Sequence, residues 1–479
     1  MKLRDIFTNI DFNDEDGNIE VLGICIDSRK VGRGDLYVAI KGLHVDGHSF
    51  IEDAVARGAV AVLASSSERQ VAVPMVLAED VRLALSQVAR RFYGDPAKGM
   101  KLVGVTGTNG KTSTTSFVEG ILRASGERVG VIGTLGVRLD GERLDMPFAT
   151  STTPDTIELF EIIKAMADAG CKYLVMEVSS HALALHKVAS LRFDVGIFTN
   201  LSQDHLDFHG TMENYRLAKA GLFDISDVAV INNDDEARDF LLEYTAQRCK
   251  TITFGIDGGD YCASNCVLQS GGVSYIIKGQ SVDVPIAGKF TIYNTLAALA
   301  ACDVLGIDIK QIANALSGVK GVDGRIQSIP NDRNIGVIVD YAHTPDGLEN
   351  IITACREFTK GRIITVFGCG GDRDPIKRPI MGEMAGRLSD YCIITSDNPR
   401  NENPEEIIAQ VEQGMLKSNC KYEKIIDRCV AINTAIDMAK ASDCVIIAGK
   451  GHETYQEFKN GRRVDFDDAK VAKIALKNA

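Results

Sequence analysis

From Lys101 onward, short apolar runs alternate with longer amphipathic stretches. The apolar runs lack the polar–apolar alternation of a half-exposed strand, and this is typical of strands covered on both faces of a parallel sheet. The pattern therefore predicts an α/β region with a parallel sheet between helices. The predicted elements are, in order, strand 101–107, helix 111–125, strand 128–133, helix 155–170, strand 172–178, strand 194–200, helix 213–223 and strand 227–232.

A second region of the same kind begins near Ile335, after a less regular segment at 251–285. Its pattern predicts another doubly wound, Rossmann-like unit. The predicted elements are strand 336–343, helix 348–358, strand 362–368, a helix near Met381, strand 391–399, helix 404–415 and strand 444–451.

The residues before Lys101 form a unit of their own, with strand-like runs at 21–27, 35–40 and 59–64 and a helical stretch after Val81. Residues 93–99 carry Pro and Gly and are typical of a linker. The chain has 479 residues, which at ~150 residues per domain also suggests three domains. We predict an N-terminal domain at 1–98, a central domain at 99–329 and a C-terminal domain at 330–479.

Charge and apolar content exclude some partners. The net charge of −12 disfavours a nucleic-acid surface or an anionic membrane as partner. No apolar run reaches the ~18 residues of a membrane span, and the first twenty residues do not resemble a signal peptide. The twelve cysteines are scattered without a CxxC pair, which favours reduced thiols. We therefore expect a cytoplasmic protein that binds no nucleic acid and does not insert into a membrane.

Unusual polar segments follow the predicted strands. In open α/β sheets, ligands bind beyond the carboxyl ends of the strands, so this placement favours an enzyme. The segments are GTNGKT, EVSSH, TNLSQDHLDFHG, DYAHTPD, FGCGGDRD, SDNPR and GKGHE.

The first segment has the context of a phosphate-binding loop, between a strand and a helix. Gly107 and Gly110 allow a tight turn, Lys111 can reach terminal phosphates, and the Thr112 hydroxyl can bind Mg²⁺. The usual spacing has Gly six residues before the lysine, where this chain has Val105. The chemistry of a nucleotide-phosphate site is nevertheless complete.

Further candidates lie at neighbouring strand ends. Glu177 ends one strand, His205 and His209 follow the next, and Lys219 lies on the helix after that. Together with the phosphate loop they indicate a metal and phosphoryl-transfer site. A GTPase switch should carry an NKxD segment, which is absent, whereas a motor or transport ATPase stays compatible with the loop alone.

GTNGKT, EVSSH, TNLSQDHLDFHG with a downstream LAK, and DYAHTPD together resemble the Mur ligases over nearly the whole chain. DSR near residue 28, GCGGDRD, DNPR and GKGHE resemble the branch that adds the third residue of the peptidoglycan stem peptide, in its meso-diaminopimelate form. The resemblance implies a UDP-binding N-terminal domain, a central ATPase and a C-terminal domain that brings the amino acid. It implies an ATP- and Mg²⁺-dependent ligase acting on UDP-MurNAc-L-Ala-D-Glu through an acyl phosphate, and we expect a monomer.

The resemblance also assigns residues. It implies catalytic roles for Lys111, Glu177, His205 and Lys219, with one Mg²⁺ held by Thr112 and Glu177 and a second held by Glu177, His205 and Lys219 as its carbamate (N6-carboxylysine). It implies ATP contacts from Gly107, Thr108, Asn109, Gly110, Lys111, Thr112, Ser113, Asn294 and Arg325. It implies UDP-sugar contacts from Ser28, Thr152, Thr153, Ser179 and Lys187. Where the family has an arginine, this chain has Lys187, and Leu185 replaces a polar residue; lysine keeps the charge but loses bidentate geometry.

Diaminopimelate differs from lysine by a second carboxylate, which a fixed guanidinium can bind through two hydrogen bonds. The resemblance assigns this role to Arg400, and the diaminopimelate site to Arg373, Asp397, Asn398, Pro399, Arg400, Gly449 and Glu453.

The sequence also allows purely structural roles for three of these residues, and other functions for the chain. Lys219 could be a surface lysine of an i,i+4 pair, Asn294 a helix cap, and Arg400 part of a surface ion pair. The whole chain could also be a lysine-adding ligase, a folylpolyglutamate synthetase-like ligase or a nucleotide-regulated binding module.

Overall fold

The computed structural model describes residues 1–8, 10–42, 45–66, 71–150, 152–269, 271–319, 321 and 324–478, without the side chain of Asp207. It divides into two compact units, Met1–Phe254 with Ala300–Ile307, and Gly255–Leu299 with Asp308–Ala479.

The first unit opens with a small parallel sheet in the order β1-β2-β3-β4. Its core is aliphatic, and α4 begins where the Asp80 carboxylate accepts hydrogen bonds from the Arg82 and Leu83 amides, both at 2.9 Å. The elements of this part are α1 (Leu3–Ile6), α2 (Asp14–Gly17), β1 (Gly23–Cys25), η1 (Ser28–Lys30), β2 (Asp35–Val38), η2 (Gly47–Phe50), α3 (Ile51–Arg57), β3 (Ala61–Ala64), β4 (Met75–Leu77) and α4 (Val81–Phe92).

A larger sheet follows in the order β12-β11-β10-β5-β9-β6-β7-β8. The strands from β12 to β6 are parallel, which confirms the predicted α/β class. The antiparallel edge made by β7 and β8 was not predicted. The strands are β5 (Lys101–Thr106), β6 (Val129–Gly133), β7 (Gly136–Leu139), β8 (Glu142–Leu144), β9 (Tyr173–Glu177), β10 (Phe193–Phe198), β11 (Ser226–Asn232) and β12 (Lys250–Gly255).

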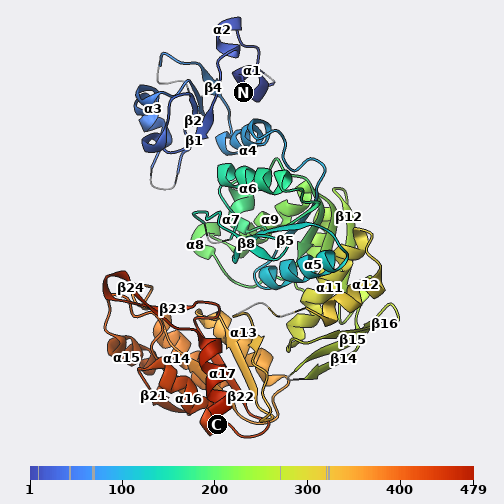
Figure 1. Ribbon diagram of the computed structural model, residues 1–479, viewed down its shortest axis with the longest axis vertical. Coiled ribbons are helices and arrows are strands. Elements are labelled where there is room, and N and C mark those ends of the chain that lie inside the picture. Colours follow the sequence, from blue (N-terminus) through green and yellow to red (C-terminus); the bar gives the residue numbers. More distant parts are fainter. Residues whose placement is uncertain are drawn as a thin grey trace. The chain divides into compact units, whose positions relative to one another are not determined.

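The three helices predicted in this part, at 111–125, 155–170 and 213–223, are present as α5 (Lys111–Ala124), α6 (Thr156–Asp168) and α9 (Met212–Ala220) (Figure 1), whereas the helices at 180–184, 206–209 and 238–245 were not predicted. The buried stripe of α6, with Leu159, Phe160, Ile163 and Met166, packs with strand residues in one aliphatic core. The helices are α5 (Lys111–Ala124), α6 (Thr156–Asp168), α7 (Ser180–Ala184), α8 (Leu206–His209), α9 (Met212–Ala220), η3 (Gly221–Ile225) and α10 (Arg238–Thr245).

The second unit contains the segment whose pattern was least regular. There, β14, β15 and β16 form a small antiparallel sheet with alternating burial along β15. The elements are β13 (Tyr261–Cys262), β14 (Ser264–Gln269), β15 (Gly272–Ile277), β16 (Gln280–Val284), α11 (Lys289–Val304), which contributes residues to both units, and α12 (Ile309–Ser317).

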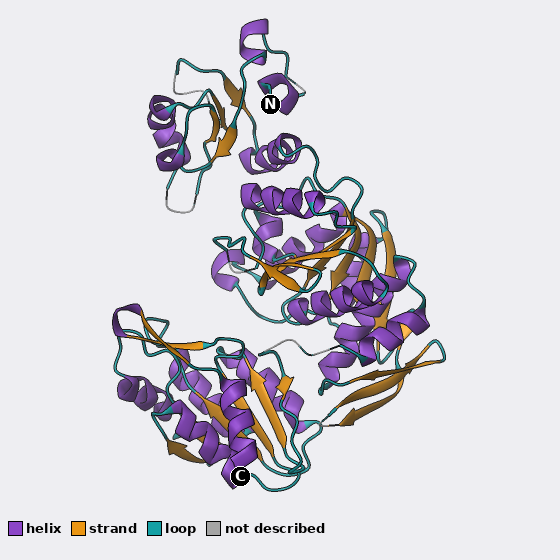
Figure 2. Ribbon diagram, viewed as in Figure 1, coloured by secondary structure: helices purple, strands orange, loops and turns teal. Residues whose placement is uncertain are grey.

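The C-terminal sheet has the order β17-β18-β22-β19-β20-β21, and only β17 is antiparallel to its neighbour. Helices cover both of its faces (Figure 2), as predicted for a doubly wound unit. Alternate residues of β18 show this directly, because Ile338 joins the core under α13, α14 and α15, whereas Val337 and Val339 join the core under α16 and α17.

The elements of this part are β17 (Gln327–Ser328), β18 (Gly336–Asp340), α13 (Pro345–Arg356), β19 (Ile363–Phe367), α14 (Lys377–Leu388), β20 (Tyr391–Ile394), α15 (Pro404–Met415), β21 (Lys421–Lys424), α16 (Arg428–Met438), β22 (Cys444–Ala448), β23 (Tyr455–Phe458), η4 (Lys459–Gly461), β24 (Arg462–Asp465) and α17 (Asp468–Asn478). Among the described residues, no helix combines the length and the apolar character needed to cross a bilayer.

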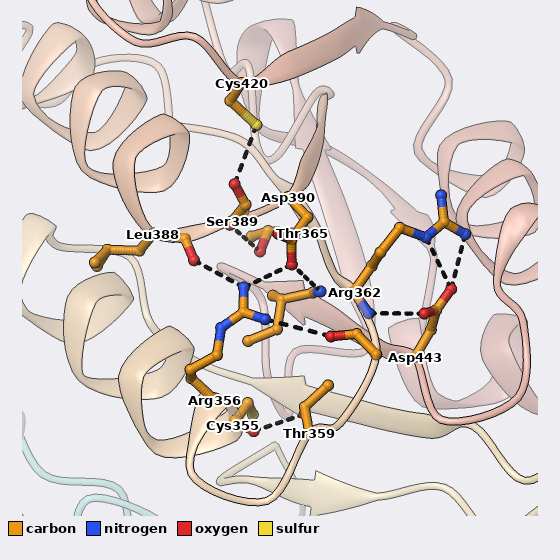
Figure 3. A network of polar contacts seen from close by, with 12 residues as sticks. Cys355, Arg356, Thr359, Arg362, Thr365, Leu388, Ser389, Asp390, Cys420 and Asp443 are labelled. Carbon is orange, nitrogen blue, oxygen red and sulfur yellow. Dashed lines mark hydrogen bonds and ion pairs between the residues drawn. The ribbon is translucent and has the colours of Figure 1, made fainter.

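A polar network closes the amino ends of the C-terminal strands, at the edge opposite to the polar motifs (Figure 3). The Asp443 carboxylate accepts hydrogen bonds from the Arg362 amide and guanidinium, both at 2.7 Å, and from the Lys440 amide at 2.9 Å. Asp390 accepts from Arg356 at 2.6 Å and from the Ile363 amide at 2.7 Å. The carboxylates thus accept hydrogen bonds from backbone amides that have no partner within the β-sheet.

We expect Asp443→Asn to lower the free energy of unfolding at pH 7 by about 1–3 kcal/mol. Burial opposes ionisation of Asp443, but the hydrogen bonds from Lys440 and Arg362 outweigh it and lower the pKa of the carboxyl. Because the pKa of Asp443 is lower in the folded protein than in the unfolded chain, its ionised carboxylate stabilises the fold at pH values above the ordinary aspartate pKa. This stabilisation is lost as the pH falls through the pKa of the folded protein. Urea unfolding from pH 3 to pH 7 checks this, because the difference between wild type and variant should shrink towards the acid end; a pH-independent difference would contradict it.

Candidate active site

The phosphate-binding loop between β5 and α5 has the backbone that its glycines predicted. Gly107 has a φ of 143° and Gly110 a φ of 85°, both in the region that favours glycine. A Cβ on Gly107 would lie 1.9 Å from Thr199 Oγ1, so no side chain fits there. Thr199 itself donates to the Asn109 carbonyl at 2.6 Å and ties the loop to the end of β10.

Lys111 lies at the first position of α5, and its ammonium donates to the carbonyls of Gly107 and Thr108, both at 2.9 Å. These contacts bring the charge over the loop that the sequence predicted as a phosphate cradle. The helix N-terminus adds a partial positive charge there. Ser113 lies half-buried two residues further along the helix.

Glu177 is the centre of a buried polar group at the carboxyl end of β9. Its residue is 2% exposed, and its carboxylate accepts hydrogen bonds from the Thr112 hydroxyl at 3.0 Å, the Thr134 amide at 2.9 Å and the Thr134 hydroxyl at 3.1 Å. Among the described residues, no Lys, Arg or His forms an ion pair with it. A buried carboxylate without a cationic neighbour, beside a threonine hydroxyl, suits a hard divalent cation such as Mg²⁺.

The two predicted threonines continue this group. Thr153 donates to the Glu177 carbonyl at 2.9 Å and to Ser179 Oγ at 3.3 Å, and Thr152 Oγ1 lies 3.3 Å from Thr134 Oγ1. Ser179 also caps α7 by accepting from an amide of its first turn. The structure therefore brings three of the five predicted sugar-peptide contacts beside the predicted metal carboxylate.

Lys187 and Ser28 lie elsewhere. The Lys187 ammonium is 2.5 Å from an Asp155 carboxylate oxygen, and its residue is 8% exposed. Leu185 is the residue after α7, half-buried. Ser28 is buried at the start of η1 and, among the described residues, shares no hydrogen bond with the other predicted contacts.

Lys219 is buried, so the alternative of a surface lysine is wrong. The residue is 2% exposed, and its Nζ lies 4.3 Å from the centre of the Tyr215 ring. Within the described part of the chain it forms no ion pair and donates no hydrogen bond. Burial, and then the charge of Lys111, lower the pKa of Lys219 well below its usual value. Such a lysine is a more available nucleophile than a surface ammonium.

His205 lies beside this lysine's helix, in a cluster of rings. Its backbone is left-handed, with a φ of 51°, and its Nε2 lies 3.3 Å from an Asp204 carboxylate oxygen. The His181 ring is 4.9 Å away between centres, and His209 is buried with Nε2 2.9 Å from Ser180 Oγ. The described residues hold no group of three or more His, Cys, Asp and Glu arranged as metal ligands. The predicted Mg²⁺ set contains only two residues of these types.

The second unit holds the predicted diaminopimelate residues at the carboxyl ends of β19, β20 and β22. Asn398 is 3% exposed and donates from Nδ2 to Glu453 Oε2 at 2.8 Å. Lys450, which is fully buried, donates to the same Glu453 oxygen at 2.8 Å and to Asn398 Oδ1 at 3.0 Å. Although burial opposes ionisation, Lys450 and Asn398 lower the pKa of Glu453. This carboxylate is thus held in its anionic form.

Arg400 and Arg373 both approach Gly370. A Cβ on Gly370 would be 3.1 Å from Arg400 Nη1 and 3.7 Å from Arg373 Cγ. Arg400 donates to the Gly371 carbonyl at 2.7 Å and lies 3.6 Å from Glu457 Oε2. Arg373 is exposed and, in the described ranges, forms no ion pair or side-chain hydrogen bond. Two guanidinium groups on neighbouring loops can converge on one carboxylate.

The remaining residues of this predicted site shape its backbone. A Cβ on Gly449, whose φ is 119°, would lie 2.7 Å from Asp397 Oδ2. Asp397 accepts from the Asn398 amide at 2.6 Å, and the carbonyl of buried Pro399 is close to Gly371. All seven predicted residues therefore lie on the three loops that follow these strands.

Asn294 and Arg325 also belong to the second unit. Asn294 is 5% exposed inside α11, so the alternative that it caps a helix is wrong. The Arg325 guanidinium lies 5.0 Å from the Tyr341 ring centre, and its Nε is buried without a hydrogen-bond partner among the described residues. Their predicted contact with ATP stays a prediction.

Several residues of these groups were not predicted from the sequence. Thr134 lies in the turn between β6 and the unpredicted strand β7 and carried no motif, and Tyr215 precedes LAK on α9. The Tyr215 hydroxyl lies 3.2 Å from Thr108 Oγ1, so it connects the phosphate loop with the helix of Lys219. Lys450 was visible in GKGHE, where its position between two residues of the site was a usable signal.

A phosphate loop and a buried lysine and carboxylate at the edge of a parallel sheet define a P-loop α/β enzyme. Three stretches of the chain match known domains: residues 20–93 match the catalytic domain of the Mur ligase family, 105–302 the Mur ligase middle domain and 324–451 the Mur ligase glutamate ligase domain. The chain belongs to the Mur ligase family.

Similar proteins agree over nearly the full length. The chain is 45% identical to the UDP-N-acetylmuramoyl-L-alanyl-D-glutamate–2,6-diaminopimelate ligase of Caldanaerobacter subterraneus subsp. tengcongensis, covering 96% of this chain and 95% of that one. It is also 45% identical to the ligase of the same name from Clostridioides difficile, covering 99% of both. A solved structure of a ligase of that name superposes with a TM-score of 0.75 at 33% identity, covering 100% of this chain and 99% of the other.

Proposed function

We propose that this protein is an ATP-dependent ligase that adds meso-diaminopimelate to the D-glutamate γ-carboxylate of UDP-N-acetylmuramoyl-L-Ala-D-Glu, in peptidoglycan precursor synthesis. The relatives named for this reaction support the proposal. The observation that carries it is that Arg373 and Arg400 both approach Gly370, while Asn398, two residues before Arg400, donates a hydrogen bond to the anionic Glu453. Diaminopimelate offers a carboxylate to the guanidinium groups and an ammonium to Glu453.

The first chemical step requires two anions to approach. The substrate γ-carboxylate attacks the γ-phosphorus of ATP, the bond to the β–γ bridging oxygen breaks, and an acyl phosphate and ADP form. Lys111 offsets the repulsion between the anions, because its ammonium lies over the loop that cradles the phosphates. The loop amides, presented by Gly107 to Ser113, bind the phosphate oxygens.

The second step forms the amide bond. The free amine of diaminopimelate attacks the acyl carbon, and a tetrahedral intermediate forms. Its collapse expels inorganic phosphate, and the amine loses a proton. Thr152, Thr153, Ser179 and Lys187 hold the muramoyl-peptide portion, and Ser28 contacts the uracil end.

The site fits Mg²⁺, which when bound supplies charge neutralisation of the phosphate oxygens. Thr112 and Glu177 would hold one ion, and Glu177, His205 and Lys219 as its carbamate would hold a second. A neutral Lys219 amine attacks the carbon of CO₂ and loses a proton, and the resulting carbamate is anionic. The burial of Lys219 without an acceptor among the described residues supports this assignment, because a neutral amine tolerates that environment better than an ammonium does.

Three domains, with divisions near residues 98 and 329, would each bring one substrate: the UDP-sugar, ATP and the amino acid. The 20–93 match to the Mur ligase family disfavours a folylpolyglutamate synthetase-like ligase, which should lack this N-terminal region. A cytoplasmic location and a monomeric state complete the proposal.

The decisive experiment measures phosphate release from ATP and Mg²⁺ with the UDP-muramoyl dipeptide, adding meso-diaminopimelate or L-lysine in parallel. We expect release with diaminopimelate and at least ~100-fold less with lysine, because lysine leaves Arg400 desolvated and unpaired. Phosphate release only with lysine would support the ligase reaction but refute diaminopimelate as the substrate. Release with neither would overturn the ligase assignment.

Arg400→Ala should raise the KM for diaminopimelate by about 100-fold or more, while the KM for ATP stays within about threefold. The guanidinium binds only the amino-acid substrate, so the two constants should separate in steady-state kinetics. Equal, modest rises in both constants would contradict the role of Arg400.

Lys219→Ala should reduce the rate of phosphate release by on the order of 100-fold, because an anionic ligand at the phosphoryl site is lost. Added formate or acetate should restore part of this rate. Lys164→Ala is the matched control, since Lys164 is a half-exposed lysine on α6 that pairs with Asp168 one turn away. Full activity of Lys219→Ala would refute the carbamate.

A further inference from the structure

Arg378, in the first turn of α14, is the most enclosed guanidinium near the diaminopimelate site. The residue is 1% exposed. It donates to Gln410 Oε1 at 2.8 Å and to the Gly370 carbonyl at 3.1 Å. A buried guanidinium requires acceptors on several sides, so its partners are held firmly in place.

Glu402 is the main partner of Arg378. The two side chains form a bidentate pair, with Nη1 2.7 Å from Oε2 and Nη2 2.8 Å from Oε1. The same Oε1 accepts a hydrogen bond from the Asp372 amide at 2.5 Å. The hydrogen bonds from Arg378 lower the pKa of Glu402, so the carboxylate is anionic. The pair therefore fixes both ends of the loop 370–372.

This loop in turn holds Arg400. The Gly371 carbonyl accepts from Arg400 Nη1 at 2.7 Å, and the Gly371 amide donates to the Asn398 carbonyl at 2.9 Å. A Cβ on Gly371 would lie 1.9 Å from the Pro399 carbonyl, so the two loops pack backbone to backbone. The other acceptor of Arg400, Glu457, is looser at 3.6 Å.

We propose that Arg378 and Glu402 are positioning residues for substrate selection, because they hold the Gly371 carbonyl that orients the Arg400 guanidinium. The inference rests on the proposed function. Arg400 has a left-handed backbone, with a φ of 50°, on a loop between β20 and α15. Bidentate recognition of a carboxylate depends on orientation, so a loop that shifts by a fraction of an ångström weakens it. Neither positioning residue needs to touch the substrate.

The test compares Glu402→Gln and Arg378→Lys with the wild type. The glutamine side chain has the size of glutamate and keeps an acceptor for the Asp372 amide, so Glu402→Gln should fold. Both variants should raise the KM for meso-diaminopimelate by about 10- to 100-fold, with the KM for ATP within about threefold of wild type. The preference for meso-diaminopimelate over L-lysine should fall in both variants.

Asp390→Asn is the matched control, because it weakens an Arg–carboxylate pair of the same domain at the amino ends of the strands (Figure 3). It should leave the KM for diaminopimelate unchanged. An equal rise in both KM values for Glu402→Gln, together with a lower Tm, would indicate a merely structural role and overturn the proposal. An unchanged KM for diaminopimelate in a folded variant would overturn it as well.

A double-mutant cycle separates the remaining possibilities. If Glu402 acts through Arg400, Glu402→Gln should add less than about twofold to the KM of Arg400→Ala, because the group that it orients is gone. Fully additive effects would overturn the proposal. A wild-type enzyme that releases no phosphate with diaminopimelate would instead refute the proposed function, so the two failures are distinguishable.

Discussion

In the central and the C-terminal sheets the parallel strands end at one edge, and the backbone groups beyond their last residues must find hydrogen-bond partners outside the sheet. The candidate site depends on this constraint. At the end of β9, the Thr153 hydroxyl donates a hydrogen bond to the Glu177 carbonyl. In the loop after β20, Gln456 Nε2 donates to the Asp397 carbonyl at 2.8 Å. Polar side chains that hydrogen-bond to the backbone at this edge are therefore also in the place where a ligand binds.

The candidate sites of the two units differ in how their buried charges are paired. In the site of the first unit, Glu177 accepts from hydroxyl and amide donors, and neither Glu177 nor Lys219 forms an ion pair among the described residues. In the second unit, Lys450 pairs with Glu453 and Arg378 with Glu402. Uncompensated buried charge is costly unless a ligand supplies the opposite sign. The first unit thus favours charged ligands, whereas the second has a preorganised frame whose exposed guanidinium, Arg373, remains available.

The opposite edge of the C-terminal sheet shows what the same residue types do without a ligand. Arg362, Asp443, Arg356 and Asp390 form ion pairs that also close backbone amides at the amino ends of the strands (Figure 3). Each of the two carboxylates accepts from a guanidinium and from a backbone amide of the protein. Position along the strand, and not residue type, therefore separates a structural arginine from one that can recognise a substrate.

The sequence by itself determined the local features. The spacing of apolar residues predicted two regions in which parallel strands alternate with helices, although it did not predict β12, β21, α10 or α16. GTNGKT predicted a turn that needs positive φ at Gly107 and Gly110. Both signals act over a few neighbouring residues. The sequence placed Glu177 and Arg400 after strands, and hence at the ligand edge. Only the tertiary structure decided which residues distant in the sequence contact one another. Thr134 donates a hydrogen bond to Glu177, Lys187 pairs with Asp155, and Arg378 pairs with Glu402. These contacts join residues from different strands and helices, and the packing of the elements sets them, so no local pattern encodes them.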